Sequence, residues 1–219
     1  METTLTEENY LKAIYQFGGN GNKVVSTNSL ADALDTKASS VTDMIKKLSE
    51  KELVNYEKYQ GVHLTKEGEK IALNIIRKHR LWEVFLVEKL NFRWDEVHDI
   101  AEYLEHVNSN VLFERLEKFL GHPKFDPHGD PIPNKDGDFT AHEDFCLLDM
   151  KKGSKGKIVG VKQHTSAFLQ YLENLNLVVG AEIKVLEKLE FENSVKIEVR
   201  GKEQILSGNV GDKLYIAKI

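Results

Sequence analysis

All four prolines of this chain lie in one short segment, between Pro123 and Pro133. The same segment carries glycines and aspartates, a composition that opposes both regular helix and regular strand. Before it, hydrophobic residues recur mainly at helical spacing, whereas after it they form short β-rich runs. The prolines therefore predict a linker that ends a helical part and precedes a β-rich domain.

The N-terminal third carries the pattern of a winged helix-turn-helix. Thr4 and Glu7 are spaced as a capping box that begins a first helix. A short second helix follows, and the third is expected to begin near Ser39 or Ser40, either of which can act as its N-cap. The run over 54–64, with a turn at its Gln-Gly pair, predicts a β-hairpin. In a winged helix of this layout the third helix enters the major groove of DNA.

Polar side chains on the third helix and at the hairpin tip are the candidate DNA contacts, because hydroxyls and lysines donate to phosphates and base edges. They are Thr36, Lys37, Ser39, Ser40, Thr42, Asp43, Lys46 and Lys47, together with Lys58 and Tyr59. The alternative is a helix-turn-helix that contacts only proteins. The formal charge of −5 counts against DNA binding, because phosphates repel an acidic protein.

The acidity is concentrated in the middle of the chain, where six potential metal ligands lie on two consecutive predicted helices. Residues 71–145 carry a net charge of −6, whereas residues 146–219 carry +3. The six side chains are His79, Glu83, His98, Glu102, Glu105 and His106. On a helix over roughly 94–107, the last four fall within an arc of about 100°. The first two are spaced to point the same way from the preceding helix.

This donor set predicts a divalent first-row metal, because imidazole and carboxylate are common ligands of such ions. Cys146 is the single cysteine, which excludes an internal disulfide, a thiolate-only zinc site and an iron–sulfur cluster held by one chain. Two alternatives stay open. The carboxylates can be merely solvated, which leaves a metal-independent winged-helix regulator. The metal can also activate water in a hydrolase fused to the winged helix, although no G-x-S-x-G or phosphate-binding glycine motif occurs.

The remaining histidines are weaker candidates for metal binding. His122, His128 and His142 lie in or beside the proline-rich segment and are interpreted as ordinary loop residues. His164 precedes a predicted helix in the last part of the chain, from where it can reach a metal.

The last third of the chain is expected to form a small five-stranded barrel similar to an SH3 fold. Strands are predicted over 157–161, 183–185, 195–199 and 213–216, with one helix over 165–175. Neither an export signal nor an apolar run of ~18 residues occurs, so we expect a cytoplasmic protein.

With these motifs in place, the whole chain resembles the diphtheria-toxin-repressor family of metal-dependent transcriptional repressors, which includes the manganese transport regulators. The segments that carry the resemblance are YLKAIY (10–15), SVT (40–42), EKYQGV (57–62), RKHR (77–80), VH (97–98), LEH (104–106) and PHGDPIP (127–133). The resemblance implies a homodimer that binds palindromic operator DNA once metal has ordered the N-terminal helix.

The same resemblance implies how the metal ligands are divided between two sites. The family's ancillary site matches His79, Glu83 and His98. Its primary site matches Glu102, Glu105 and His106, together with a donor from the first helix, which is Asn9 here.

Three positions distinguish this chain within the family. Glu102 stands where iron-type members have Cys, and a carboxylate is the harder ligand, which favours Mn(II) over softer metals. Lys12 stands where manganese-type members can carry a Glu ligand. Phe168 aligns near a barrel position that supplies a ligand in some members, and His164 or Gln163 can substitute for it.

Together these patterns predict a mainly α protein with a small β part. We expect a winged-helix DNA-binding domain over 1–70, a helical metal-binding and dimerisation domain with its linker over 71–145, and an SH3-like (FeoA-like) barrel over 146–219. The expected function is a repressor of metal-uptake genes that is loaded with Mn(II) or Fe(II), at two ions per chain. Its expected partners are double-stranded operator DNA and a second copy, with no membrane, no small organic substrate and no enzymatic activity.

Overall fold

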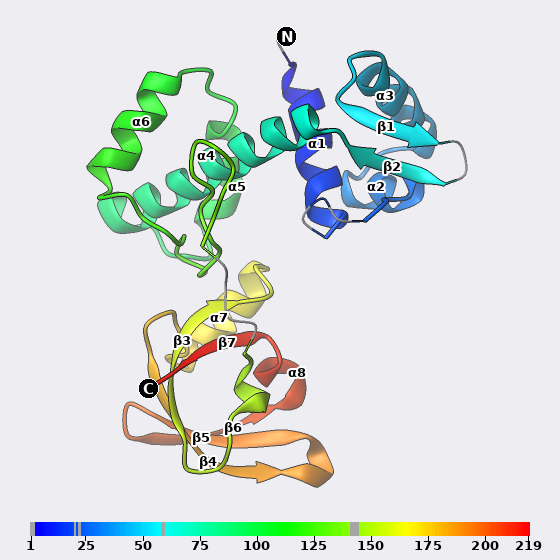
Figure 1. Ribbon diagram of the computed structural model, residues 1–219. Coiled ribbons are helices and arrows are strands. Elements are labelled where there is room, and N and C mark those ends of the chain that lie inside the picture. The colour runs from blue at the N-terminus through cyan, green and yellow to red at the C-terminus, as the bar shows by residue number, and fades with distance from the viewer. Residues whose placement is uncertain (1–2, 20, 22, 58–59, 141–144) are drawn as a thin grey trace. The chain divides into compact units, whose positions relative to one another are not determined.

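The computed structural model describes residues 3–19, 21, 23–57, 60–140 and 145–219, and it divides into two compact units. The first unit comprises Met1–His79, Glu102–Asn110 and Pro133–Asp138, and the second comprises Arg80–Ala101, Val111–Ile132 and Phe139–Ile219. Buried apolar side chains form a core in each unit, and Figure 1 labels the helices and strands that supply them. Among the described residues, no helix combines the length and the apolar character needed to cross a bilayer.

The first unit contains the predicted winged helix-turn-helix. Its elements are α1 (Leu5–Phe17), α2 (Thr27–Ala33), α3 (Ala38–Glu50), β1 (Val54–Glu57) and β2 (Gly61–Leu64). Fully buried apolar side chains from these elements form its core, namely Leu11, Ile14, Leu30, Val41, Ile45, Leu48 and Val62. The apolar positions of α3 recur at three- and four-residue spacing, so one face of the helix packs inward and the other stays available.

The helix starts are partly as predicted. Thr4 and Glu7 form the complete capping box that begins α1. The expectation that Ser39 or Ser40 caps the third helix is wrong, because α3 begins at Ala38 and its N-cap is Lys37, without a side-chain cap bond. The turn that follows α2 is closed by the Thr36 N–H, which donates to the Ala31 carbonyl at 2.9 Å. The next helix begins directly after this turn, and Ser39 and Ser40 lie exposed within its first turn.

The hairpin pairs β1 with β2 in antiparallel register from Val54↔Leu64 to Glu57↔Gly61. An isolated antiparallel bridge joins Val25 to Val62 of β2. Gly61 is required at this crossing, because its φ is +114° and a Cβ atom would lie 2.5 Å from the Val25 carbonyl oxygen. The predicted DNA contacts Lys58 and Tyr59 lie outside the described residues.

Three further helices follow, and the first two of them carry predicted metal ligands. They are α4 (Lys66–Leu90), α5 (Val97–Leu104) and α6 (Asn110–Phe119). The fifth helix is shorter than the predicted span of 94–107, because the Val107 N–H bonds to the Leu104 carbonyl at 3.2 Å and closes the chain into a turn. Glu105 and His106 therefore lie in this turn and not on the helix itself.

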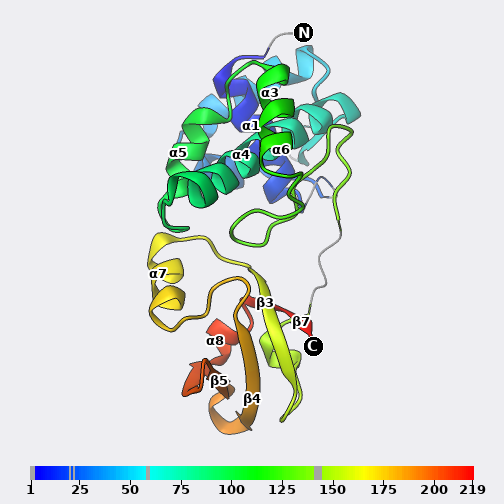
Figure 2. The same cartoon turned by 90° about the vertical axis from the view of Figure 1, so that its left-hand side faces the viewer.

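The C-terminal part of the second unit is an antiparallel five-stranded sheet in the order β6-β5-β4-β3-β7, which confirms the SH3-like prediction. Figure 2 shows β3, β4, β5 and β7 of this sheet, with α7 and α8. The strands are β3 (Lys155–Val161), β4 (Glu182–Leu189), β5 (Ser194–Val199), β6 (Lys202–Ser207) and β7 (Leu214–Lys218). The expected helix is α7 (Ser166–Asn174). A single-turn helix, η1 (Leu147–Asp149), precedes β3, and two others, η2 (Glu190–Glu192) and α8 (Gly208–Gly211), join β4 to β5 and β6 to β7. Of the five strands, β6 is the one for which the sequence had indicated no residues.

Candidate metal centre

Helix α1 is anchored to α3, the predicted recognition helix, through one buried carboxylate. The Glu7 side chain is 0% exposed, and its Oε1 lies 2.8 Å from Nζ of Lys51 and 3.1 Å from Nζ of Lys47. Burial alone raises the pKa of Glu7, but hydrogen bonds from Lys51, the Thr4 backbone and Lys47 outweigh it and lower this pKa to about 2. The carboxylate is therefore charged at neutral pH and holds the two helices together.

The next residue along α1 orients His106. Oε2 of Glu8 lies 2.6 Å from Nδ1 of His106, and a carboxylate at that distance accepts the Nδ1 proton. The proton on Nδ1 leaves the lone pair on Nε2, the other ring nitrogen. A carboxylate behind an imidazole in this way is the usual partner of a metal-binding histidine.

Three buried acceptor atoms of the first unit have no hydrogen-bond partner among the described residues. They are Nε2 of His106, Oε1 of Glu105 and Oδ1 of Asn9. The first two face each other at 3.7 Å. Buried polar atoms are rarely left unpaired, because each unpaired one costs about 1–3 kcal/mol. One nitrogen and two oxygens are ligands that suit Mn(II) or Fe(II), so the residues present fit a divalent ion.

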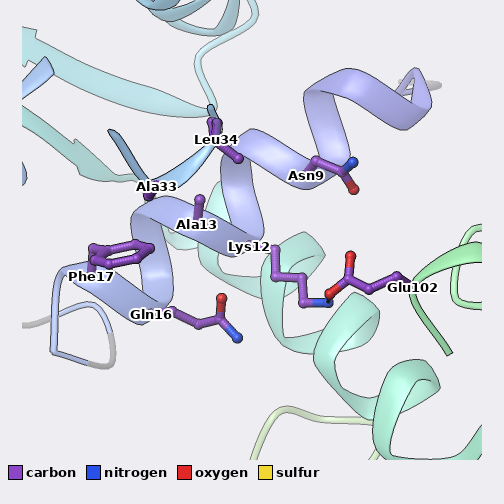
Figure 3. A pocket seen from close by; sticks show the side chains of 8 residues that line it. All are labelled: Asn9, Lys12, Ala13, Gln16, Phe17, Ala33, Leu34 and Glu102. Atoms are coloured by element: carbon purple, nitrogen blue, oxygen red, sulfur yellow. Dashed lines mark hydrogen bonds and ion pairs between the residues drawn. The ribbon is translucent and has the colours of Figure 1, made fainter. Parts of the chain in front are cut away.

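Asn9 and Glu102 line one cavity of about 280 Å³ beside α1 (Figure 3). Its other lining residues are Lys12, Ala13, Gln16, Phe17, Ala33 and Leu34. Thus all four predicted primary ligands, Asn9, Glu102, Glu105 and His106, lie in the first unit, on α1 and at the end of α5. Sequence reasoning missed Glu8, although its place beside Asn9 in the first turn of α1 was a usable signal.

Lys12 lies inside a second group of potential ligands in the same unit. Ligand atoms of His79, Glu102 and Glu105 lie within 4.8 Å of one another. Nζ of Lys12 is 2.6 Å from Oε1 of Glu102, 2.7 Å from Oε2 of Glu105 and 3.3 Å from Nδ1 of His79. Figure 3 shows the Lys12 side chain extending from α1 to the Glu102 carboxylate.

The second unit contains another buried cluster, built around Glu83 of α4. Ligand atoms of Glu83, Asp126 and His128 lie within 4.8 Å of one another, and all three residues are buried. Nδ1 of His128 is 3.6 Å from Oε2 of Glu83, and its Nε2 donates to the Trp94 carbonyl at 2.7 Å. Burial lowers the pKa of His128, but Glu83, Asp126 and the Trp94 carbonyl outweigh it and raise the pKa to about 9.

The proline-rich loop supplies two of these side chains. Oδ1 of Asp126 accepts the N–H groups of His128 at 2.8 Å and Asp130 at 2.9 Å, which shapes the loop into a tight turn. Gly129 has a φ of +90°, and a Cβ atom there would lie 2.1 Å from the Val159 carbonyl oxygen, so the loop packs against β3. Burial and the Glu83 carboxylate raise the pKa of Asp126.

Four other histidines were assessed from the sequence. His98 is half-exposed, with Nδ1 3.6 Å from Oε1 of Glu83. The ring of His164 lies 4.9 Å from that of His128, and burial lowers its pKa. His122 is an exposed loop residue, as predicted, and His142 lies outside the described residues. By contrast, the interpretation of His128 as an ordinary loop residue needs correction, because its side chain is 2% exposed.

His79, a predicted ancillary ligand, has a close contact through one of its two ring nitrogens. It precedes Glu83 by one turn of α4, but its Nδ1 lies 2.6 Å from Oε2 of Glu105 in the first unit. The ancillary assignment of His79, Glu83 and His98 therefore stays a prediction. Glu83 already has Asp126 and His128 as buried neighbours within its own unit.

The predicted DNA contacts in and just before α3 face outward. Lys37, Ser39, Ser40, Asp43, Lys46 and Lys47 are exposed, and Thr36 and Thr42 are half-buried. Thr42 Oγ1 donates to the Ala38 carbonyl, and Lys46 pairs with Asp43 at 3.6 Å. Although Lys47 contacts Glu7, half of its side chain stays exposed. This face of α3 is therefore free of the unit's core.

A winged helix and buried imidazole–carboxylate clusters on one chain define a metal-responsive DNA-binding regulator. Three family models match along the chain. "Iron dependent repressor, N-terminal DNA binding domain" matches residues 2–62, "Iron dependent repressor, metal binding and dimerisation domain" matches 65–134, and "FeoA domain" matches 145–218. The chain belongs to the iron-dependent repressor family, the family of the diphtheria toxin repressor, whose members are metal-dependent transcriptional repressors.

Individual relatives agree with this assignment. A manganese-dependent transcriptional repressor solved in complex with manganese is 33% identical, with a TM-score of 0.83 over 97% of this chain and 100% of that one. The manganese regulator SloR is 36% identical, with a TM-score of 0.75 over 97% and 98% of the two chains. The iron-dependent repressor of Mycobacterium tuberculosis is 34% identical over 128 residues, which are 58% of this chain and 55% of the relative.

Proposed function

We propose that this chain is a homodimeric repressor that binds palindromic operator DNA when loaded with Mn(II) or Fe(II), and that it controls metal-uptake genes. The observation that carries the proposal is the set of three buried, unpartnered acceptors on Asn9, Glu105 and His106, with Glu8 holding the tautomer of His106. Two relatives that align along nearly the whole chain are named as manganese regulators, which supports Mn(II). Such a regulator works where the DNA is, in the cytoplasm.

Asn9, Glu102, Glu105 and His106 would hold the primary ion. When bound, the ion supplies positive charge to the acceptors of Asn9, Glu105 and His106, which have no hydrogen-bond partner among the described residues. Asn9 belongs to α1 and His106 to the turn after α5, so shared coordination fixes α1 against that turn. Because Glu7 of α1 forms ion pairs with Lys47 and Lys51, a shift of α1 would also move α3. Binding then favours the DNA-competent arrangement by its differential affinity, with coupling of ~1–3 kcal/mol.

A second ion would bind at Glu83, which gives the predicted total of two per chain. Its partners are His79 and His98, as the family resemblance implies, or Asp126 and His128, which the loop brings close to it. His164 lies beside His128 and can contribute from the C-terminal domain. His98→Ala and His128→Ala distinguish the two ligand sets, because only the substitution that removes a true ligand should weaken binding of the second ion.

The proposal divides the chain as the sequence predicts, into DNA binding over 1–70, metal binding and dimerisation over 71–145, and an SH3-like domain over 146–219. Dimerisation is supported by α6, which exposes Val111 at 58% and Phe119 at 66% while burying Phe113. Apolar side chains of this size on an exposed helix face are typical of protein interfaces. A regulator, not a metal-dependent hydrolase, is the role that the family's named repressors support.

The proposal is tested with operator DNA selected from random sequences by the Mn(II)-loaded protein. Fluorescence anisotropy then measures its affinity with Mn(II), with Fe(II) and with chelator. We expect metal to tighten binding about 5–150-fold. His106→Ala should remove this response while the circular dichroism spectrum stays unchanged. Equal affinity with metal and with chelator would contradict the proposal and favour the metal-independent regulator.

A further inference from the structure

Three groups that could hold an ion already surround a cation that belongs to the protein. Nζ of Lys12 lies 2.6 Å and 2.7 Å from the carboxylate oxygens of Glu102 and Glu105, and 3.3 Å from Nδ1 of His79. Ligand atoms of the same three residues lie within 4.8 Å of one another. The ammonium group therefore sits among the donors, in the place where an ion bound by them would lie.

The surroundings of Lys12 make this more than a surface ion pair. Its side chain is 7% exposed, and that of Glu105 is 0% exposed. Burying an ammonium costs several kcal/mol unless opposite charges and hydrogen bonds compensate. Two carboxylates around one ammonium supply that compensation, so the positive charge at this position is structurally required.

Glu105 connects this position to the proposed primary site. Its Oε2 faces Lys12 and His79, whereas its Oε1 has no hydrogen-bond partner in the described part of the chain and lies 3.7 Å from Nε2 of His106. The Glu105 carboxylate thus binds the Lys12 ammonium through Oε2, while Oε1 can still accept a bond from a metal ion. With Oε2 held by Lys12, Oε1 is kept turned towards His106.

We propose that Lys12 is a built-in cation that takes the place of a second divalent ion beside the primary site. The inference rests on the proposed function. The primary region then binds one divalent ion per chain, and Lys12 docks α1 onto Glu102 and Glu105 before that ion arrives. Lys12 is thereby a positioning residue for Glu105. It also determines how many divalent ions the primary region binds.

The test counts Mn(II) ions in the full-length protein. Lys12→Gln and Lys12→Glu remove the ammonium and offer an oxygen ligand in its place, whereas Lys12→Arg keeps a positive charge. Equilibrium dialysis with elemental analysis gives the ions per chain. Electron paramagnetic resonance reports whether two Mn(II) ions share a ligand, because such ions are magnetically coupled. Lys70→Gln, an exposed lysine on α4, is the control for loss of charge alone.

We expect Lys12→Gln or Lys12→Glu to bind one more Mn(II) per chain than the parent protein and to give a coupled spectrum. Lys12→Arg and Lys70→Gln should keep the parent's number. The same number in all variants, or a coupled pair already present in the parent, would overturn the role of Lys12. A parent protein that binds no Mn(II) at all would instead refute the proposed function, so the two failures are distinguishable. If Lys12→Gln fails to fold, Lys12→Glu still tests the proposal, because the added ion can neutralise the new carboxylate.

Discussion

Replacing Glu7 with glutamine tests how strongly α1 is anchored to α3. The Glu7 carboxylate is completely buried and contacts Lys51 and Lys47 at 2.8 and 3.1 Å, and Oε2 accepts the Thr4 N–H at 2.8 Å. Glutamine keeps the shape of the side chain and can still accept from Thr4. It removes the charge that the two ammonium groups compensate, so Glu7→Gln isolates the electrostatic part of the anchor.

The expected magnitude follows from the pKa of Glu7, which burial raises but the Lys51, Thr4 and Lys47 hydrogen bonds lower from 4.5 to about 2. Each pKa unit corresponds to ~1.4 kcal/mol, so the charged form stabilises the fold by about 3 kcal/mol. The folded-state pKa lies below the unfolded-state value. This stabilisation is therefore complete well above pH 4.5 and is lost as the pH falls from 4.5 towards 2.

Urea denaturation of the metal-free protein, followed by circular dichroism at pH 7 and at steps down to pH 3, measures this contribution. We expect Glu7→Gln to lose about 2–3 kcal/mol at pH 7, and the difference from the parent to shrink as the pH falls. Glu50→Gln, at an exposed position on α3, should change stability by less than about 0.5 kcal/mol. Equal losses in the two variants, or a Glu7→Gln difference that does not depend on pH, would refute the reasoning.

Three further predictions concern metal binding, DNA binding and assembly. Glu8→Gln should weaken Mn(II) binding about 10–100-fold in calorimetry, because His106 loses the carboxylate that fixes its tautomer; unchanged affinity would show that Glu8 does not support a ligand. Lys37→Ala should weaken binding to operator and unrelated DNA alike and reduce the salt slope by ~0.9, and an unchanged slope would mean that Lys37 contacts no phosphate. Val111→Glu should give a monomer in sedimentation velocity, whereas a persistent dimer would place the interface elsewhere than this face of α6.

The elements that the sequence predicts well are those with local signals. The Thr4–Glu7 capping box is one, because both halves of the motif lie within one helical turn. The hairpin is another, since its alternating residues are neighbours in the chain. The predicted Gln-Gly turn is misplaced by a residue, because Gly61 already belongs to β2 and pairs with Glu57. Strand β6 (Lys202–Ser207) was not identified, because only Ile205 and Leu206 are strongly apolar in it and β-propensity depends on the neighbouring strand.

The site was only partly predictable, because its partners are distant in sequence. Glu7 was recognised as a capping residue, but its contact with Lys51 spans 44 positions, and the contact between Lys12 and Glu105 spans 93. No local pattern encodes such pairs. Helical periodicity placed Glu105 and His106 on the fifth helix, but that helix ends at Leu104 and both residues lie in the turn that follows, where Nδ1 of His106 lies 2.6 Å from Oε2 of Glu8 on α1.

His128 shows a different limit of sequence reasoning. Its neighbours in the chain are prolines, glycine and aspartates, which predict a solvated loop. The structure buries it because Gly129 allows the loop to approach β3 and Asp126 ties the turn together. Burial here is decided by packing between distant segments and not by composition.

The coupling between metal and operator DNA is reciprocal, and its most direct test is therefore the Mn(II) affinity itself, measured with and without a saturating selected operator. If Asn9, Glu102, Glu105 and His106 hold the ion that positions α3, operator DNA should tighten Mn(II) binding by the same factor, about 5–150-fold, by which Mn(II) tightens DNA binding. His106→Ala should lose both effects together. An Mn(II) affinity that is the same with and without operator DNA would contradict metal control of DNA binding by this chain.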